Sequence, residues 1–269
     1  MTPPATDPTT GTASGEWLEL PAERKDGAYP DAKEIKLSVG GERNYTHYYD
    51  TKTYTSLWVA YPLEAKHMGE LSRPGSWSYN PEIDEQYQVN LCDYSYNDSY
   101  SRGHLIPNGS RNGIKEMQKQ TFYVTNSVPQ VQDSFNNGIW SSLEGALQSK
   151  AKSQTLYIVT GVAFEKVGEQ KTITYTTAQD DTKQVPVPNY FYKVVLSATT
   201  DSSGTVTSAQ TIGFWFEHKE YSGVSYTNYA VSVDQIEAWT GFDFFPNLPD
   251  AIEVVAEQND SWSNFQTEK

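Results

Sequence analysis

His104, Asn136 and Glu144 are three side chains whose types suit metal-assisted hydrolysis. A histidine titrates near neutral pH and can therefore take the proton from an attacking water molecule. Amide and carboxylate oxygens bind hard cations such as Mg²⁺, and such a cation neutralises the negative charge that develops on a phosphate during hydrolysis. The residue types therefore predict phosphodiester hydrolysis, with a histidine base and an oxygen-bound cation.

His104 is the strongest candidate for the base. It follows Arg102 and Gly103 and precedes an apolar Leu-Ile-Pro sequence, so we expect it at the beginning of a strand or at the edge of a loop. Glycine has no side chain, and we expect Gly103 to leave room for a ligand close to the backbone. Taken alone, His104 is equally consistent with a structural histidine in a turn, but its neighbours favour the catalytic role.

Asn136 is the candidate metal ligand, and the sequence predicts a helix over residues 136–150. At the beginning of that helix, the positive end of the helix dipole would also favour a phosphate. Steps of four residues place Asn136, Trp140 and Glu144 along one ridge of the helix. Glu144 would then hold a water bound to the cation or orient His104. Taken singly, Asn136 also fits a helix cap, and Glu144 fits a solvated helix face.

Other polar side chains around this stretch are weaker candidates. Arg73 lies in a Ser-Arg-Pro-Gly sequence and is expected to reach a phosphate from a loop, or else to be a solvated arginine. Asn126 and Gln130 flank a segment that contains a proline, where active-site and turn hydrogen-bonding roles are equally consistent with the sequence. A short basic stretch after the histidine could form a local phosphate track, and it comprises Arg111, Lys115 and Lys119.

The composition limits the class of protein. The formal net charge is −14, which is unfavourable for tight nucleic-acid binding because basic surfaces supply most of that affinity. An enzyme that binds phosphate through a cation and a few arginines remains compatible with this charge. The single cysteine, Cys92, excludes an intramolecular disulfide and a cysteine-based zinc site, and its apolar surroundings predict a buried residue.

The pattern of residues predicts one domain of the α+β class with a largely antiparallel central sheet and flanking helices. Expected strands cover 45–50, 56–63, 121–125, 155–161, 190–198 and 209–216, with a small hairpin over 172–177 and 184–187. Expected helices cover 112–120, 136–150 and 233–240, the last beginning with a Ser232 cap. No run of apolar residues is long enough for a membrane span.

The N-terminal residues differ in composition from the rest. Residues 1–20 are predicted to form a flexible tail rich in proline and threonine, and residues 21–269 a single domain. The first fifteen residues lack the apolar centre of a signal peptide. Such a tail often follows a removed export signal or lipid anchor, so we expect an exported protein, whether secreted, periplasmic or surface-anchored, with the cytoplasm as the alternative.

Three motifs together resemble the DNA/RNA non-specific endonucleases of the ββα-metal group. They are Arg102-Gly103-His104, then Thr-Asn-Ser-Val-Pro-Gln at residues 125–130, and Asn-Asn-Gly-Ile-Trp-Ser-Ser-Leu-Glu at residues 136–144. Weaker similarity extends the resemblance over residues 43–249, through Leu-Trp-Val-Ala-Tyr at 57–61 and Thr-Gly-Phe-Asp-Phe-Phe-Pro at 240–246.

The resemblance implies a role for each candidate. His104 would be the general base, and Asn136 would bind Mg²⁺ directly, with Mn²⁺ or Ca²⁺ possible in the same site. Glu144 would assist at the metal, and a supporting role toward the phosphate or the histidine would fall to Arg73, Arg102 and Asn126. The substrates would be DNA and RNA, which such enzymes contact through the backbone without sequence preference.

Two positions depart from the family pattern. Ser101 stands where the family has an aspartate before the Arg-Gly-His triplet, and Gln148 stands where it often has an arginine. These departures, together with the charge of −14, support an alternative hypothesis: a non-catalytic nuclease-like domain that acts as an extracellular or surface binding module. The sequence does not indicate an oligomeric state.

Overall fold

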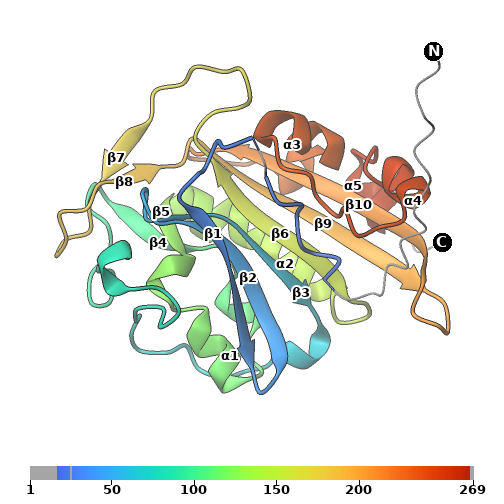
Figure 1. Ribbon diagram of the computed structural model, residues 1–269, viewed down its shortest axis with the longest axis horizontal. Coiled ribbons are helices and arrows are strands. Elements are labelled where there is room, and N and C mark those ends of the chain that lie inside the picture. Colours follow the sequence, from blue (N-terminus) through green and yellow to red (C-terminus); the bar gives the residue numbers. More distant parts are fainter. Residues whose placement is uncertain (1–16, 25, 267–269) are drawn as a thin grey trace, which may run out of the picture.

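In the computed structural model, which describes residues 17–24 and 26–266, the chain folds around a seven-stranded antiparallel sheet (Figure 1). The strand order is β1-β2-β3-β6-β9-β10-β11. These strands are β1 (Ala32–Val39), β2 (Glu42–Asp50), β3 (Thr55–Leu63), β6 (Leu156–Ala163), β9 (Tyr190–Thr200), β10 (Val206–Glu217) and β11 (Ala230–Val231). The predicted α+β class with an antiparallel sheet is confirmed.

Helices flank this sheet. They are α1 (Lys115–Gln120), α2 (Ser141–Lys150), α3 (Val233–Thr240), α4 (Asp250–Ala256) and α5 (Trp262–Gln266), and a π-helical segment, η5 (Gln132–Trp140), precedes α2. The predicted cap of α3 is present, because the Ser232 hydroxyl accepts a hydrogen bond of 3.2 Å from the backbone N–H of Gln235. Helix α3 ends at Gly241, whose φ of +69° is a left-handed conformation that favours glycine.

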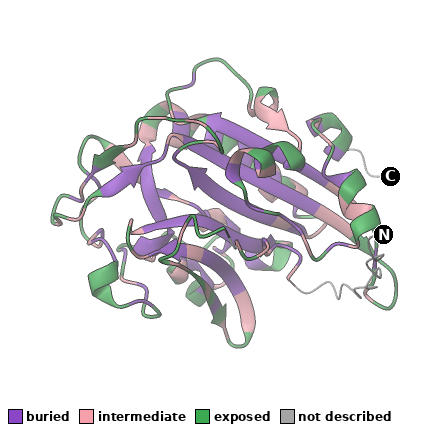
Figure 2. Ribbon diagram, turned by 45° about the horizontal axis from the view of Figure 1, so that its top comes forward, coloured by how far each residue is buried: buried purple, intermediate pink, exposed green. Residues whose placement is uncertain are grey.

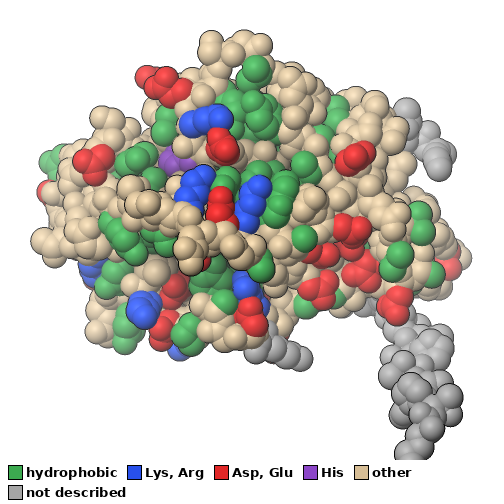
Figure 3. Space-filling model, turned by 90° about the horizontal axis from the view of Figure 1, so that it is seen from above, with side chains coloured by type: hydrophobic (Ala, Val, Ile, Leu, Met, Phe, Trp, Pro, Cys, Tyr) green, Lys and Arg blue, Asp and Glu red, His purple; other side chains and the backbone are tan. Residues whose placement is uncertain are grey.

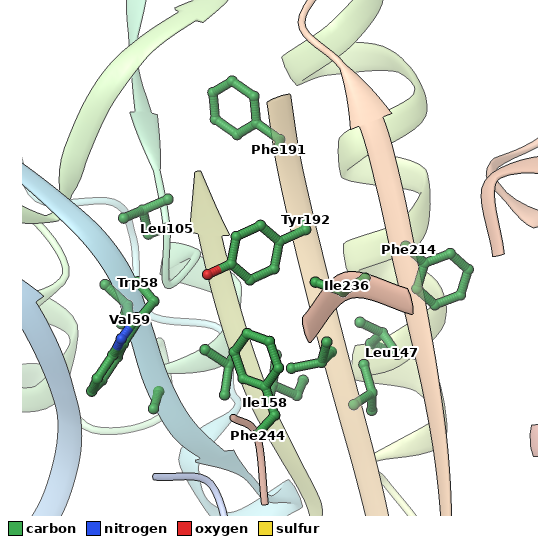
Figure 4. Packing of buried hydrophobic residues seen from close by; sticks show 14 of the residues in the cluster. Trp58, Val59, Leu105, Leu147, Ile158, Phe191, Tyr192, Phe214, Ile236 and Phe244 are labelled. Carbon is green, nitrogen blue, oxygen red and sulfur yellow. The ribbon is translucent and has the colours of Figure 1, made fainter. Parts of the chain in front are cut away.

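Strand β9 lies at the centre of the core, and its side chains alternate between two covered faces. The Phe191 ring lies 5.1 Å from that of Phe135 in η5, whereas the Tyr192 ring lies 5.8 Å from that of Phe244. Tyr192 and Phe244 point toward each other beside the strands in Figure 4. Burial on both faces explains why the central strands β3, β6 and β9 are buried over most of their length, as the purple central strands of Figure 2 show.

A second, two-stranded sheet carries the candidate base. Strand β4 (Tyr100–His104) pairs antiparallel with β5 (Ser127–Val131), and His104 lies opposite Ser127. A connection that contains α1 separates β4 from β5, whereas β5 leads directly into η5 and α2, so the paired strands and these helical segments form a ββα unit. The predicted hairpin also forms, as β7 (Thr174–Thr176) paired with β8 (Val185–Val187).

Two sequence predictions about the elements are wrong. Residues 121–125, predicted as a strand, form the turn after α1 and the beginning of a 3-10 helix, η4 (Val124–Asn126), where the Thr121 hydroxyl donates to the Gln118 carbonyl at 2.8 Å. The predicted tail also ends earlier than residue 20. Leu18 is fully buried and Glu19 lies 3.1 Å from Arg43, whereas residues 1–16 lie outside the described part of the chain.

Among the described residues, no helix combines the length and the apolar character that crossing a membrane would require.

Candidate active site

A cleft of about 540 Å³ lies where β4 meets η5 and α2. Five of the six side chains predicted for the site line this cleft, namely Arg73, Arg102, His104, Asn136 and Glu144. The sequence thus identified side chains that the fold brings together from a loop, a strand and two helical segments. Several polar residues that the prediction did not include also line it, among them Ser95, Asn108, Gln132 and Asn137.

His104 occupies the end of β4 in an aromatic setting. Its ring centroid lies 4.6 Å from that of Trp77 and 4.9 Å from that of Phe122. Its Nε2 atom is buried and has no hydrogen-bond partner among the described residues. Burial, and then the positive charges of Arg73 and Arg102, lower the pKa of His104 to about 3. The imidazole is therefore neutral at working pH and has a free nitrogen that can accept a proton.

Asn136 lies in the interior of η5, not at the beginning of a helix as predicted. Its Nδ2 donates to Gln132 Oε1 at 3.0 Å and to Ser101 Oγ at 3.4 Å. Both of these hydrogen bonds use the nitrogen, so the carboxamide oxygen is left for a ligand. The expected assistance from a helix N-terminus is therefore absent at Asn136, and the Ser101 hydroxyl instead orients the amide.

The helix that was predicted to carry both Asn136 and Glu144 is not continuous. Gly138 has non-helical backbone angles, φ −109° and ψ −108°, and α2 begins only at Ser141. Trp140 is fully buried, whereas Asn136 and Glu144 line the cleft. The predicted single ridge through Asn136, Trp140 and Glu144 is therefore replaced by two segments that present one polar side chain each.

Lys193 is a residue of the site that the sequence prediction missed. It is fully buried in β9, and its Nζ lies 3.6 Å from a Glu144 carboxylate oxygen and 4.3 Å from the Trp140 ring centroid. The Nζ also donates to Thr160 Oγ1 at 2.8 Å. A lysine within the apolar strand at residues 190–196 is the signal that could have revealed it, because buried lysines are rare unless paired.

Burial raises the pKa of Glu144, and the Lys193 ammonium opposes this shift. Burial likewise lowers the pKa of Lys193 to about 8, and Glu144 opposes that shift. Each charge stabilises the other in surroundings that disfavour both. Lys193 thus opposes the rise in the pKa of Glu144 that burial causes at the wall of the cleft.

Two arginines supply positive charge to the cleft. Arg102 is half-buried and held in place, since its Nη1 donates to the Leu91 carbonyl at 2.7 Å and its guanidinium lies 5.2 Å from the Trp77 ring centroid. Arg73 is exposed and lies 5.1 Å from the Phe122 ring centroid. Among the described residues, Arg73 has no ion-pair partner within 4.0 Å, so its guanidinium can bind a phosphate.

Asn126 is not part of the cleft wall. It is fully buried, its Oδ1 accepts from the backbone N–H of Ile106 at 3.0 Å, and its Nδ2 donates to the carbonyls of Ile106 and Thr121. These bonds hold the segment that follows His104. Of the two predicted supporting roles, the one toward the phosphate is therefore wrong, whereas support of His104, here through the segment that follows it, stays a prediction.

The space over Gly103 is also filled. A Cβ atom at Gly103 would clash with the Gln130 side chain, which is fully buried beneath β4. Glycine is needed here because β5 packs closely against it, and the expectation of a ligand at this position is wrong. Gln130 belongs to the support of β4 and does not line the cleft.

The basic stretch after the histidine does not form a phosphate track. Arg111 is fully buried, and its Nη2 donates to the carbonyls of Asn44 at 2.7 Å and Pro62 at 2.9 Å. Lys119 pairs with Glu116 on α1 at 2.9 Å. Arg111 therefore joins strands of the sheet to the loop after η3 (Asn108–Ser110).

Cys92, predicted to be buried, is half-buried.

The residues of this cleft lie within the part of the sequence that matches a known protein family. The sequence matches the family described as DNA/RNA non-specific endonuclease over residues 32–251, which includes both strands of the ββα unit and the whole cleft. The chain belongs to the DNA/RNA non-specific endonuclease family. The resemblance seen in the three motifs is thereby confirmed.

Curated relatives in this family are nucleases. The chain is 31% identical to Nuclease C1 from Cunninghamella echinulata over 63% of its length and 66% of the relative. It is 29% identical both to the mitochondrial Nuclease 1 of Schizosaccharomyces pombe, over 76% and 65% of the two chains, and to the mitochondrial nuclease EXOG of Danio rerio, over 77% and 61%. The chain thus spans about two thirds or less of these relatives.

The fold is also similar to a solved structure, that of EndoG in the EndoG/EndoGI complex, with a TM-score of 0.67, 21% identity, and coverage of 81% of this chain and 88% of that one. At this identity the likeness concerns the fold.

Several relatives, including those from fission yeast and zebrafish, are named mitochondrial nucleases. The expectation of an exported protein, which came from the N-terminal composition alone, is contradicted by them and is wrong.

Proposed function

We propose that this chain is a metal-dependent endonuclease that hydrolyses phosphodiester bonds of DNA and RNA, with His104 as the general base. The observation that carries the proposal is that His104, whose imidazole burial keeps neutral, lines one cleft together with Asn136, Glu144 and two arginines. Membership of a nuclease family supplies the substrate class. The open cleft of about 540 Å³ argues against the non-catalytic alternative, for which a collapsed site is expected.

The chain's own residues account for the proton transfer. In this proposal His104 accepts a proton from the attacking water, and its low pKa keeps the imidazole neutral before the reaction. The resulting imidazolium is stabilised when the negatively charged phosphate lies between it and Arg73. The arginines, which repel a proton from His104 in the empty cleft, are then neutralised by substrate.

The donor set of the cleft fits a hard divalent cation. The Asn136 carboxamide oxygen and the Glu144 carboxylate are oxygen donors, and Mg²⁺ is bound through few protein ligands because it keeps several waters. When bound, Mg²⁺ would polarise the phosphate and stabilise the leaving oxygen. Glu144 serves this purpose when ionised, and the Lys193 ammonium 3.6 Å away favours the ionised form.

The two arginines of the cleft predict that the protein recognises the phosphate backbone of nucleic acid. Arg73 and Arg102 offer guanidinium donors that match phosphate oxygens. A protein with a formal charge of −14 has little general attraction for nucleic acid, so we expect weak binding and rapid release. Cleavage of both DNA and RNA without sequence preference follows from contacts of this kind.

The test is a gel assay of the full chain with supercoiled plasmid and with RNA. We expect cleavage of both with Mg²⁺ and none with a chelator. His104→Ala is expected to reduce the rate by about 10²–10⁴, because general-base catalysis contributes that much. Lys115→Ala is the matched control, since Lys115 is exposed and outside the cleft. Undiminished cleavage by a folded His104→Ala protein would refute the assignment of the base.

A further inference from the structure

A group of carboxylates lies outside the cleft, where the end of α4 meets the beginning of α3. Asp234 and Glu237 belong to α3, and Glu257 follows α4. One oxygen from each of the three lies within 4.8 Å of the others. The two elements are joined by the backbone carbonyl of Glu257, which accepts a hydrogen bond of 3.0 Å from the N–H of Val233.

This group has no counter-charge. Within the described chain, no Lys, Arg or His lies within salt-bridge distance of Asp234, Glu237 or Glu257. The nearby charges that act on Glu257 are all carboxylates, including Glu253 and the three-residue group itself. In Figure 3, the view from above, acidic side chains gather on the right of the molecule and no basic side chain lies among them. Such a group is electrostatically unfavourable unless a cation joins it or a carboxyl takes up a proton; burial and then these carboxylates raise the pKa of Glu257 to about 9, and a cation would displace that proton.

Glu257 is the decisive member. It is only 5% exposed, and its Oε1 is buried without a hydrogen-bond partner among the described residues. A buried carboxylate oxygen without a donor loses its hydration and gains nothing in exchange. By contrast, one oxygen of Glu237 is satisfied, since it accepts from the backbone N–H of Phe244 at 2.7 Å. The unpartnered oxygen therefore indicates a missing ligand.

A second acidic group shows what a satisfied one looks like. Glu42 and Glu64 lie beside His67, and the Lys66 ammonium lies 2.7 Å from Glu42 and 2.9 Å from Glu64. There the chain supplies its own cation. At Asp234, Glu237 and Glu257 it supplies none.

We propose that Asp234, Glu237 and Glu257 form a structural site for a hard divalent cation, best matched by Ca²⁺. Carboxylates alone favour oxygen-seeking cations over zinc or copper. Ca²⁺ takes six to eight oxygens at about 2.3–2.6 Å, so two of its ligands lie up to about 4.8 Å apart, and carboxylates can each contribute two oxygens. The ion would join the beginning of α3 to the end of α4, away from the candidate active site.

The test uses calorimetric titration of CaCl₂ into the full chain carrying Asn136→Ala and Glu144→Gln, which together remove the two candidate metal ligands of the cleft. We expect one Ca²⁺ per chain, and thermal unfolding at a higher temperature with CaCl₂ than with chelator. Adding Glu257→Gln, which keeps the size of the side chain and removes its charge, is expected to abolish both effects. Adding Glu42→Gln instead is the matched control and should change neither.

Retention of the bound Ca²⁺ in the Glu257→Gln protein, or no Ca²⁺ binding by the folded Asn136→Ala/Glu144→Gln protein, would overturn the proposal. Loss of the ion on Glu42→Gln but not on Glu257→Gln would overturn it too, by assigning the site to the other acidic group. Should Glu257→Gln fail to fold, Asp234→Asn replaces it, because Asp234 is exposed and its substitution leaves the core untouched.

Discussion

Replacing Lys193 with methionine should inactivate the enzyme by an electrostatic route. Methionine fills a similar volume, so the packing of β9 against Trp140 is largely kept, and only the ammonium is lost. The Glu144 carboxylate then stays half-buried without its partner. Burial, which already raises the pKa of Glu144, is then opposed only by the nearby Trp140 indole N–H.

The size of the effect follows from the distance between the charges. Two unit charges 3.6 Å apart interact by about 4–5 kcal/mol at an effective dielectric constant near 20. Removing one partner of a buried pair typically costs about 3–5 kcal/mol. An energy of this size is enough to keep Glu144 protonated at neutral pH, and a neutral carboxyl is a poor ligand for a cation.

The assay is kcat/KM for cleavage of a short fluorescent duplex in Mg²⁺ between pH 6 and 10. We expect Lys193→Met to lose about 10²–10³ in kcat/KM at pH 7 and to recover part of the loss as the pH rises and Glu144 ionises. Thr160→Val is the matched control. It removes the 2.8 Å hydrogen bond to Lys193 but keeps both charges, so its pH profile should resemble the wild type.

Stability gives an independent measurement. The double variant Lys193→Met/Glu144→Gln has no buried charge, so it should unfold at a higher urea concentration than Lys193→Met alone. A folded Lys193→Met protein with wild-type activity and an unchanged pH profile would refute the reasoning, because Glu144 would then need no counter-ion.

Three further predictions concern other parts of the site and core. Gly103→Ala should destabilise the protein by about 1–3 kcal/mol, measured by urea unfolding, because the added methyl clashes with Gln130; an unchanged midpoint would contradict this. Ser101→Asp should tighten Mg²⁺ binding in calorimetry, since a carboxylate would hold the Asn136 amide better than the 3.4 Å contact to the hydroxyl, and weaker binding would argue against that orientation. Burial lowers the pKa of His47 to about 3 in the folded state, so its protonation in the unfolded state should remove up to about 2 kcal/mol of stability between pH 6.5 and pH 5. His47→Gln should reduce this pH dependence of the free energy of urea unfolding. An equal slope in the variant would count against the prediction.

Much of the fold could be predicted because the signal was local. Strands β3 and β9 have apolar and aromatic residues on both faces, and the Ser232 cap marks where α3 begins. Residues 121–125 misled because β-branched and aromatic residues favour strands in isolation, whereas here the Thr121 hydroxyl and the buried Asn126 amide hold the backbone in turns. Such hydrogen bonds produce no repeating pattern of apolar residues in the sequence, so the sequence alone does not reveal them.

The candidate site was predictable where motifs carried it and obscure where partners came from distant segments. His104, Asn136 and Glu144 occur close together in the sequence. Lys193 lies on a strand far along the chain, and only its burial next to Glu144 reveals its role. Arg111 shows the converse, because a basic residue beside a motif proved to be an internal anchor.

The break at Gly138 has a consequence for how the metal ligands can vary. In an uninterrupted α-helix, side chains eight residues apart point about 80° away from each other around the axis, and one could not be re-aimed without turning the other. Here Asn136 and Glu144 belong to separate segments, η5 and α2. The direction of each side chain is therefore set by its own backbone segment, so a substitution that re-aims Asn136 does not have to turn Glu144.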